Sequence, residues 1–285
     1  MGLGDDLMIT GFVEQEKNKH QNKQIVIGNL EEKKIYDSLI YLNNPNITPI
    51  DKVDRSKPIH FINYHNRNRP YIDYQNSNNN NWKWNMNFSP TPGKLYLSQD
   101  EKSKAIKILS EAKEHWKKNN NSAYKAVIFF ESTSTKIDHN FFYNKMKNKD
   151  WGEANWKKLI LKLKDKYLII QSKHKKSKRY KGAYYSSIDF NFREACSIIN
   201  ESDLFLGPEG GFGHVAAALG KKAVLYFGGW IHPKVTGYDF HENIYFDHPT
   251  SPCGAVGYIC EHCEEARRSI NADYLYDKVI STLNI

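Results

Sequence analysis

A glycine-rich loop between two short apolar runs holds the residues best suited to chemistry. Residues 209–213 read Glu-Gly-Gly-Phe-Gly, and His214 follows them. Glycines let a backbone approach a phosphate closely, and the free N–H groups at a helix start attract anions. A carboxylate and an imidazole flank this point, so Glu209 and His214 are candidate ligand contacts. The alternative interpretation is a structural turn with a solvated glutamate and a satisfied histidine, because glycine loops are common.

The elements around this loop must position it. Residues 204–206 and 223–227 are short apolar runs bounded by turn residues, which is typical of buried parallel strands. Between them, residues 214–219 are expected to form a short helix that ends before Gly220. The loop would then lie beyond the carboxyl end of a strand, where open α/β sheets bind ligands.

Two neighbouring carboxylates near the N-terminus are the second candidate for chemistry. Asp5 and Asp6 follow Gly4 at the start of a helix predicted to run to about Lys17. One interpretation is a helix cap with a charged first turn. The other is a carboxylate held at a helix start so that it faces a cleft.

Length and composition limit the class of protein. The 285 residues allow two domains, and a hydrophobic fraction of 40% is enough for real cores. No apolar run approaches about 18 residues, and the polar N-terminus does not resemble a signal segment. Four cysteines do not make a disulfide scaffold in a chain of this length, so we expect a cytoplasmic protein, with the inner face of the membrane as one location.

The net charge of +9 suggests an anionic partner such as nucleic acid, a membrane surface or a phosphorylated substrate. Much of the lysine is scattered, which makes the charge weak evidence. A strongly basic run at residues 173–181 is the exception.

Alternating apolar runs and helical patterns indicate an α/β protein. We predict strands over residues 23–28, 59–63, 126–130 and 167–171, and helices over 30–42, 99–118, 148–166 and 192–200, with two more at the end. Residues 119–122 are polar and follow a helix. They suggest a domain boundary, with one domain over 1–120 and a second over 121–285.

An asparagine-rich segment, residues 64–92, has no periodicity. Its aromatic residues Trp82, Trp84 and Phe88 suggest a stacking platform for a sugar or a base. Such loops more often pack their aromatic side chains against their own domain.

Three motifs together resemble glycosyltransferase family 9, which includes the bacterial heptosyltransferases of lipopolysaccharide core synthesis. The loop at 209–214 and its alanine-rich helix resemble the family's donor-site signature, although Glu209 stands where the family has aspartate. Residues 4–7, Gly-Asp-Asp-Leu, resemble its N-terminal Gly-Asp-x-Leu turn. Residues 149–156 resemble its Lys-x-Trp-x4-Trp/Phe segment. The three motifs occur in the family's order across nearly the whole chain.

The resemblance implies a GT-B fold, in which two Rossmann-like domains face a cleft and the second domain holds most of the nucleotide-sugar. It implies an inverting, metal-independent transfer of a heptose or similar sugar to a surface-glycan or lipid-linked acceptor. Family members usually begin with a strand before the Gly-Asp turn. We therefore expect the first domain to lack its first strand, or the start to be truncated.

The resemblance also assigns roles. Asp5 matches the proposed base, which takes the acceptor proton, and Asp6 is the neighbour that could be mistaken for it. Lys149 and the helix start would meet the charge of the leaving diphosphate, while His214 and Glu209 would contact phosphate or sugar. The expected substrate-binding residues are Gly4, Asn148, Lys149, Glu209, Gly210, Gly211, Gly213 and His214.

We expect an ADP-sugar donor, peripheral membrane contact and no organic cofactor. No Asp-x-Asp pair occurs in the sequence, so no metal is expected beside the diphosphate. Two other functions remain open: a non-catalytic basic protein that binds nucleotides or nucleic acid on the same fold, and a sugar-nucleotide epimerase or hydrolase. A nucleic-acid partner is not favoured.

Four residues near the C-terminus have donor atoms suited to zinc: Cys253, Cys260, His262 and Cys263. The adjacent His262 and Cys263 look awkward for one tetrahedral site. The spacing therefore favours reduced thiols packed in the tail, and Cys196 is expected in the core.

Overall fold

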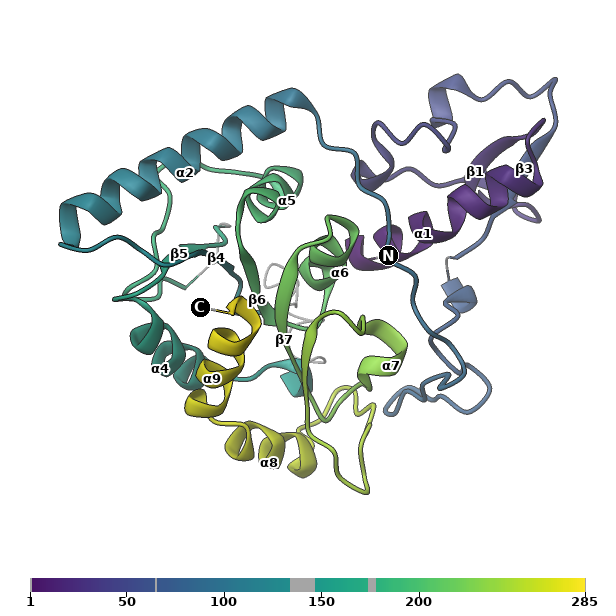
Figure 1. Ribbon diagram of the computed structural model, residues 1–285. Coiled ribbons are helices and arrows are strands. Elements are labelled where there is room, and N and C mark those ends of the chain that lie inside the picture. The colour runs from purple at the N-terminus through teal and green to yellow at the C-terminus, as the bar shows by residue number, and fades with distance from the viewer. Residues whose placement is uncertain (1, 65, 134–146, 174–177, 285) are drawn as a thin grey trace.

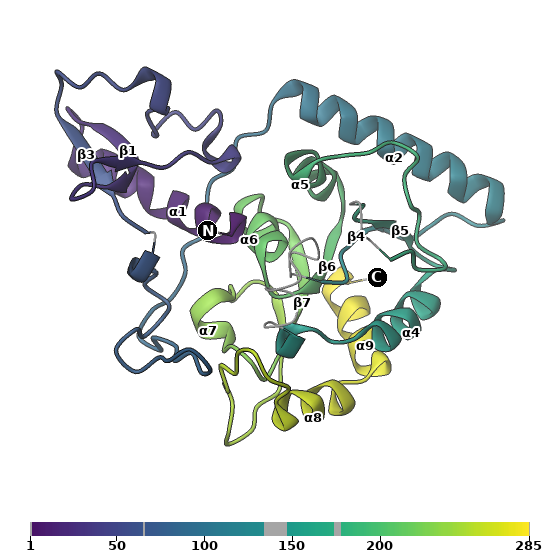
Figure 2. The ribbon, with the colours of Figure 1, turned by 180° about the vertical axis from the view of Figure 1, so that it is seen from behind.

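The computed structural model describes residues 2–64, 66–133, 147–173 and 178–284. A five-stranded sheet with helices on both faces forms its larger part, and a small three-stranded sheet lies to one side (Figure 1). Helix α1 (Leu3–Lys19) reaches from the larger part to the small sheet, as both views show (Figures 1 and 2). The α/β class predicted from the sequence is confirmed.

The large sheet is entirely parallel, with the order β5-β4-β6-β7-β8. The chain runs outward from β4 to β5, then returns past β4 to place β6 on its other side. The strand order therefore reverses between β4 and β6, which is where ligands bind in open α/β sheets. The strands are β4 (Val127–Phe130), β5 (Leu168–Gln171), β6 (Leu204–Pro208), β7 (Lys222–Gly228) and β8 (Glu242–Tyr245).

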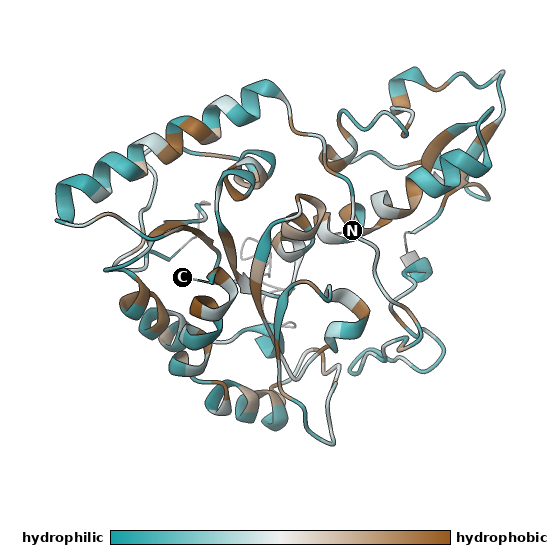
Figure 3. Cartoon of the chain, in the orientation of Figure 1, coloured by the Kyte–Doolittle hydropathy of each residue, from teal (hydrophilic) through white to brown (hydrophobic). Residues whose placement is uncertain are grey.

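Alternate residues of these strands enter two separate cores. Phe129 and Phe205 belong to the core that contains α2 (Gln99–Asn119), α5 (Phe192–Glu201) and α6 (Gly211–Ala218). Ile128 and Leu206 belong to the core on the other face, under α4 (Glu153–Leu163) and α9 (Ala272–Leu283). Because both faces are buried, β4 to β7 are largely apolar, which is why these four runs were recognisable in the sequence (Figure 3). Strand β8, at the edge of the sheet, has only one buried residue, Ile244.

Helix α2 begins with a capping box, since Ser98 Oγ accepts from the Glu101 amide at 3.2 Å and the Ser98 amide donates to Glu101 Oε2 at 2.7 Å. It packs against α5 of the large sheet although it precedes residue 121. The boundary between residues 120 and 121 stays a prediction. Two more helices lie near the tail: α7 (Pro233–Thr236) and α8 (Glu261–Ser269).

The small sheet has the order β2-β1-β3, with β1 (Gln24–Asn29) parallel to β3 (Ile59–Ile62) and antiparallel to β2 (Lys34–Ile35). The predicted helix over 30–42 is wrong. Lys33 adopts a left-handed conformation at φ 51°, and the chain turns back to form β2 and then the 3₁₀ turn η1 (Leu39–Tyr41). Leu42 is 52% exposed, so the helical spacing of apolar residues there has no surface to pack against. Two further 3₁₀ turns follow: η2 (Ile50–Lys52) and η3 (Asn66–Asn68).

Gly2 is the N-cap of α1, so Asp5 and Asp6 lie in its first turn instead of capping it. Within the part of the chain that the structure describes, no helix has the length and apolar character needed to cross a membrane.

Candidate functional site

The N-terminal ends of α1 and α6 meet beyond the carboxyl end of β6, a central strand of the large sheet. A Cβ added to Gly4 of α1 would lie 3.1 Å from the Gly211 Cα and 3.1 Å from the His214 ring, both in α6. Only glycine permits this approach without displacement of a neighbour. The contact brings Gly-Asp-Asp-Leu at residues 4–7 beside the glycine loop, two motifs that are about 200 residues apart in sequence (Figure 1).

The Asp5 side chain is held by residues of the asparagine-rich segment. Its Oδ1 accepts a short hydrogen bond from the Tyr71 hydroxyl, and its Oδ2 lies 3.3 Å from Arg69 Nε. The Gly2 amide also donates to Oδ2 at 3.3 Å. The side chain is 11% exposed, so these contacts fix a nearly buried carboxylate at the start of α1.

The Asp6 side chain has different neighbours, in the segment between β2 and η1. Its oxygens accept from the Ser38 hydroxyl at 2.7 Å and from the Tyr41 hydroxyl at 3.3 Å. Burial raises the pKa of Asp6, while the Ser38 hydrogen bond opposes the rise. The two aspartates therefore have different bonding partners, and the Asp5 carboxylate opposes the lowering of the His214 pKa in α6.

The loop after β6 lies at the point where the strand order reverses. Gly210 has φ 152° and ψ −160°, a conformation that strains any other residue, and it precedes the first residue of α6. The first N–H groups of a helix have no intrahelical partner, so this end of α6 can bind an anion. Gly213 has another role, because a Cβ there would lie 3.2 Å from Leu225 Cδ1 and separate α6 from β7.

His214 is buried and bonded to a tyrosine that the sequence analysis gave no role. Its Nδ1 lies 2.9 Å from the Tyr238 hydroxyl. Burial lowers the pKa of His214, and the Glu209 and Asp5 carboxylates only partly oppose this. The imidazole is thus favoured in its neutral form. If Tyr238 donates to Nδ1, Nε2–H of His214 is a donor for a ligand.

Lys149 and Glu209 form an ion pair beside the loop, with 2.6 Å between Lys149 Nζ and Glu209 Oε2. Both side chains are largely buried, at 15% and 8% exposure. Lys149 Nζ also lies 5.0 Å from the centre of the Trp230 ring, a cation–π contact. The structure therefore brings the Lys149 motif to the glycine loop, with Glu209 as its partner.

Asn148 is nearby, but its amide is fully engaged by the tail. Its Nδ2 donates to the carbonyls of Ala255 at 3.1 Å and Tyr258 at 2.9 Å, and its Oδ1 accepts from the Cys260 amide at 3.1 Å. These bonds fasten the segment that carries Lys149 to the loop at 253–260.

The tryptophans of the asparagine-rich segment pack against Trp230. Trp84 is buried, crosses the Trp230 ring edge-on at 4.8 Å, and donates from Nε1 to the Trp230 carbonyl at 3.1 Å. Trp82 contacts both rings. The packing interpretation therefore holds for these two residues, which stiffen the Trp230 loop under Lys149.

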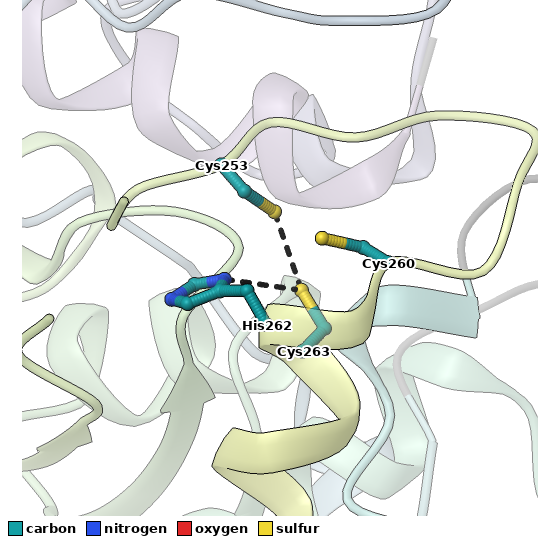
Figure 4. A group of neighbouring side chains, drawn as sticks. All are labelled: Cys253, Cys260, His262 and Cys263. Carbon is teal, nitrogen blue, oxygen red and sulfur yellow. Dashed lines mark hydrogen bonds between the residues drawn. The ribbon is translucent and has the colours of Figure 1, made fainter. Parts of the chain in front are cut away.

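The tail cysteines and His262 converge (Figure 4). One donor atom from each of Cys253, Cys260, His262 and Cys263 lies within 4.8 Å of the others. His262 turns Nδ1 toward Cys263 Sγ, at 3.9 Å, and bonds through Nε2 to Ser251 Oγ at 2.6 Å. The adjacency of His262 and Cys263 is thus no obstacle to a shared site. Cys196 is fully buried in the core, as expected.

Residues 174–177 of the basic run 173–181 lie outside the described residues. At its start, Lys173 Nζ pairs with Asp189 at 2.8 Å and bonds the Ser186 carbonyl at 2.9 Å. At its end, Arg179 stacks on Tyr185. These flanking cations are occupied by the protein's own side chains.

Sequence reasoning missed Arg69, Tyr71, Trp230 and Tyr238. The first two lie in an aperiodic segment and act on a residue more than 60 positions earlier, so no local pattern marks them. A Gly-Tyr-Asp turn at residues 237–239 was the one available signal for Tyr238.

Comparison with known proteins agrees with this geometry. The family model for glycosyltransferase family 9 (heptosyltransferase) matches residues 83–253, more than half of the chain. No curated protein matches the chain significantly over its sequence.

Several solved structures share the fold. The iron-containing dodecameric glycosyltransferase TibC from enterotoxigenic E. coli superposes with a TM-score of 0.62 at 15% identity, covering 100% of this chain and 74% of TibC. TibC in complex with ADP-D-beta-D-heptose gives 0.61 at 14% identity, with the same coverage. A family 9 glycosyltransferase from Veillonella parvula gives 0.58 at 12% identity, covering 99% and 94%. These likenesses support the GT-B architecture predicted from the motifs. With the family model, they establish that the chain belongs to glycosyltransferase family 9 and is a glycosyltransferase.

Proposed function

We propose that the protein transfers a sugar from an ADP-sugar of the heptose class to an acceptor hydroxyl, with inversion at the anomeric carbon and without a metal at the diphosphate. The observation that carries this proposal is the contact between the start of α1, with Asp5, and the start of α6, with its glycine loop. One side offers a base and the other an anion site, which are the two needs of such a reaction.

Asp5 is the proposed base. Inversion requires an acceptor oxygen to attack from the face opposite the leaving group while a base takes its proton. Tyr71 and Arg69 hold the carboxylate in place, and its charge acts on His214 across the contact between the helices. Asp6, bonded to Ser38 and Tyr41, is the proposed positioning residue that links α1 to the η1 segment.

The start of α6, Lys149 and His214 are proposed to stabilise the leaving diphosphate. Backbone N–H groups after Gly210 supply fixed dipoles, and Lys149 supplies charge in a largely buried place where it acts strongly. Glu209 holds Lys149 through Oε2, and Oε1 of the same carboxylate is proposed to accept from sugar hydroxyls. Asn148 and Gly213 position this side without a direct ligand contact.

The donor proposal takes its base and sugar from TibC, whose structure was solved with ADP-D-beta-D-heptose. The acceptor class proposed is a surface glycan or a lipid-linked precursor, with contact at the inner face of the membrane. The two-domain division at residue 120 is proposed with it.

The test is a turnover assay with ADP-, GDP- and UDP-sugars and a panel of hydroxyl acceptors, with the anomeric configuration of the product read by NMR. An ADP-sugar consumed only when acceptor is present, with inverted product, supports the proposal. Donor consumption without acceptor would identify a hydrolase or epimerase, and retention of configuration would exclude Asp5 as a simple base. Turnover should survive brief EDTA treatment.

We further propose that Cys253, Cys260, His262 and Cys263 hold one structural metal ion. Three sulfurs and one nitrogen suit zinc or iron in a tetrahedral site, and TibC is described as iron-containing. The Ser251 bond to Nε2 orients the imidazole as an outer-shell partner would. Gly229 makes room, since a Cβ there would clash with the His262 ring.

Elemental analysis should find zinc or iron in the wild type, and Cys263→Ser should lose about one equivalent per chain. Prolonged chelation should lower the melting temperature, because the metal binds the folded chain and not the unfolded chain. A metal-free wild-type chain with an unchanged melting temperature would refute this site while leaving the transferase proposal untouched.

A further inference from the structure

A second group of metal-ligating side chains lies at the other end of α1, away from Asp5. Glu16 is in the last turns of α1, His20 caps the helix, and His60 is on β3. Glu16 and His20 are four residues apart, so they share one face of the helix. His60 reaches them from the neighbouring strand, so a helix and a sheet together present the three side chains.

The three donor atoms converge. Glu16 Oε2 lies 3.0 Å from His60 Nε2 and 3.8 Å from His20 Nε2, and the two imidazole rings are 4.0 Å apart between centres. All three atoms lie within 4.8 Å of one another. Both rings thus direct the same nitrogen at the same carboxylate oxygen.

A hydrogen bond to Glu16 Oε2 accounts for His60 but not for His20. His60 Nε2 lies 3.0 Å from this oxygen, whereas His20 Nε2, at 3.8 Å, is beyond hydrogen-bond distance although it is directed at the same atom. Glu16 Oε1 already pairs with Lys19 Nζ at 2.8 Å. A divalent cation among the three atoms would instead let both rings act as neutral donors.

We propose that Glu16, His20 and His60 bind a divalent late first-row metal ion, with Zn²⁺ as the expected ligand. Two imidazoles and one carboxylate are a donor set that suits zinc, and three protein ligands leave a coordination position for water. The side chains are 25%, 29% and 25% exposed, so solvent and metal reach the site directly.

The bound ion would join the C-terminal end of α1 to β3. Because the N-terminal end of the same helix carries Asp5 and touches α6, the ion would fix the helix at its far end from the transfer site. The site is separate from the cysteine cluster in sequence and contains no sulfur.

The experiment counts metal on the full chain under reducing conditions. The chain is stripped of metal and then titrated with Co²⁺, followed by absorbance and calorimetry, and with Zn²⁺, followed by elemental analysis. Thiolate-to-cobalt charge-transfer bands report the cysteine cluster. The proposal expects a further equivalent of Co²⁺ without those bands, and the same extra equivalent of Zn²⁺.

His60→Ala and Glu16→Gln should each lower the affinity for this additional metal ion by more than about tenfold. Loss of a residue that only hydrogen-bonds a metal ligand already costs about tenfold, so loss of a ligand should cost more. His115→Ala, an exposed histidine on α2, is the matched control and should bind metal as the wild type does. Wild-type binding that His60→Ala and Glu16→Gln both leave intact, or a wild type without the sulfur-free equivalent, would overturn the proposal. Glu16→Gln changes one surface group and keeps the test valid if His60→Ala unfolds.

Discussion

The two sides of the proposed site are built in different ways. The donor side is mainly residues 207–214, a strand–loop–helix unit whose geometry follows from glycines and apolar runs that are contiguous in sequence, and Lys149 joins it from the segment before α4. The acceptor side is Asp5 and Asp6, and the side chains that bond them come from separate segments between residues 38 and 71. A local pattern can specify the first, whereas the second depends on how distant segments pack.

This difference predicts that the two sides fail differently. Damage to the donor side should weaken nucleotide binding, because its groups are proposed to contact the diphosphate directly. Damage to the acceptor side should slow the chemical step and leave donor affinity alone.

The largest effect is expected for Asp5→Asn, which keeps the size of the side chain and removes the proposed base. General-base catalysis is worth about 10²–10⁴-fold in rate, so kcat should fall by that factor while calorimetric affinity for the nucleoside diphosphate stays the same. Asp6→Asn is the matched control and should cost far less. If Asp6→Asn is the inactive variant, the two aspartates have been assigned in the wrong order.

The next effect is on donor affinity. Lys149→Ala and His214→Ala each remove a proposed donor to the diphosphate, and charge-assisted hydrogen bonds are worth about 1.5–3 kcal/mol. We expect affinity for ADP to fall about tenfold or more in Lys149→Ala by isothermal titration, with Lys157→Ala on α4 as the surface control. Equal affinities for ADP in Lys149→Ala, His214→Ala and wild type would show that the diphosphate does not bind at these residues.

The success of prediction from sequence also differs between locally patterned segments and segments defined by distant contacts. Four strands of the large sheet, β4 to β7, were predicted because burial on both faces makes each one a short apolar run. The fifth, β8, was missed because its sequence Glu-Asn-Ile-Tyr is mostly polar and only Ile244 is buried. The helix predicted over 30–42 was wrong because the prediction used only the local spacing of apolar residues. Tertiary contacts determine this segment instead: it pairs with β1 as strand β2, and Ser38 and Tyr41 bond to Asp6. Arg69 and Tyr71 could not be found, since their roles depend on a tertiary contact with Asp5.

Acid should change stability with opposite sign at His241, near the His214–Tyr238 pair, and at Asp6 on the acceptor side. Burial lowers the pKa of His241, which packs beside Tyr238, to about 4. The unfolded chain takes up this proton first as the pH falls below about 6.5, so stability is lost between pH 6.5 and 4, by at most about 3 kcal/mol. The pKa of Asp6 is raised, so its contribution is present at low pH and is lost as the pH rises through that pKa.

Denaturant unfolding at pH 7 and pH 5 measures this. His241→Gln should lose less stability than wild type between the two pH values, and His115→Gln should behave as wild type does. An identical pH dependence in His241→Gln and wild type would mean that the buried imidazole does not titrate with folding.

The smallest expected effect isolates one contact of the acceptor side. Tyr71→Phe removes the hydroxyl that bonds Asp5 and keeps the ring beside Phe88. Because the Tyr71 hydroxyl donates to the charged Asp5 carboxylate, the two residues should be coupled by about 1 kcal/mol. The coupling is measured from the free energies of unfolding in a double-mutant cycle of Tyr71→Phe and Asp5→Asn. Tyr71→Phe should therefore destabilise the wild-type chain more than it destabilises Asp5→Asn, and it should lower kcat several-fold without changing ADP affinity. Additive effects on unfolding would show that Tyr71 packs against the acceptor side without holding the Asp5 carboxylate.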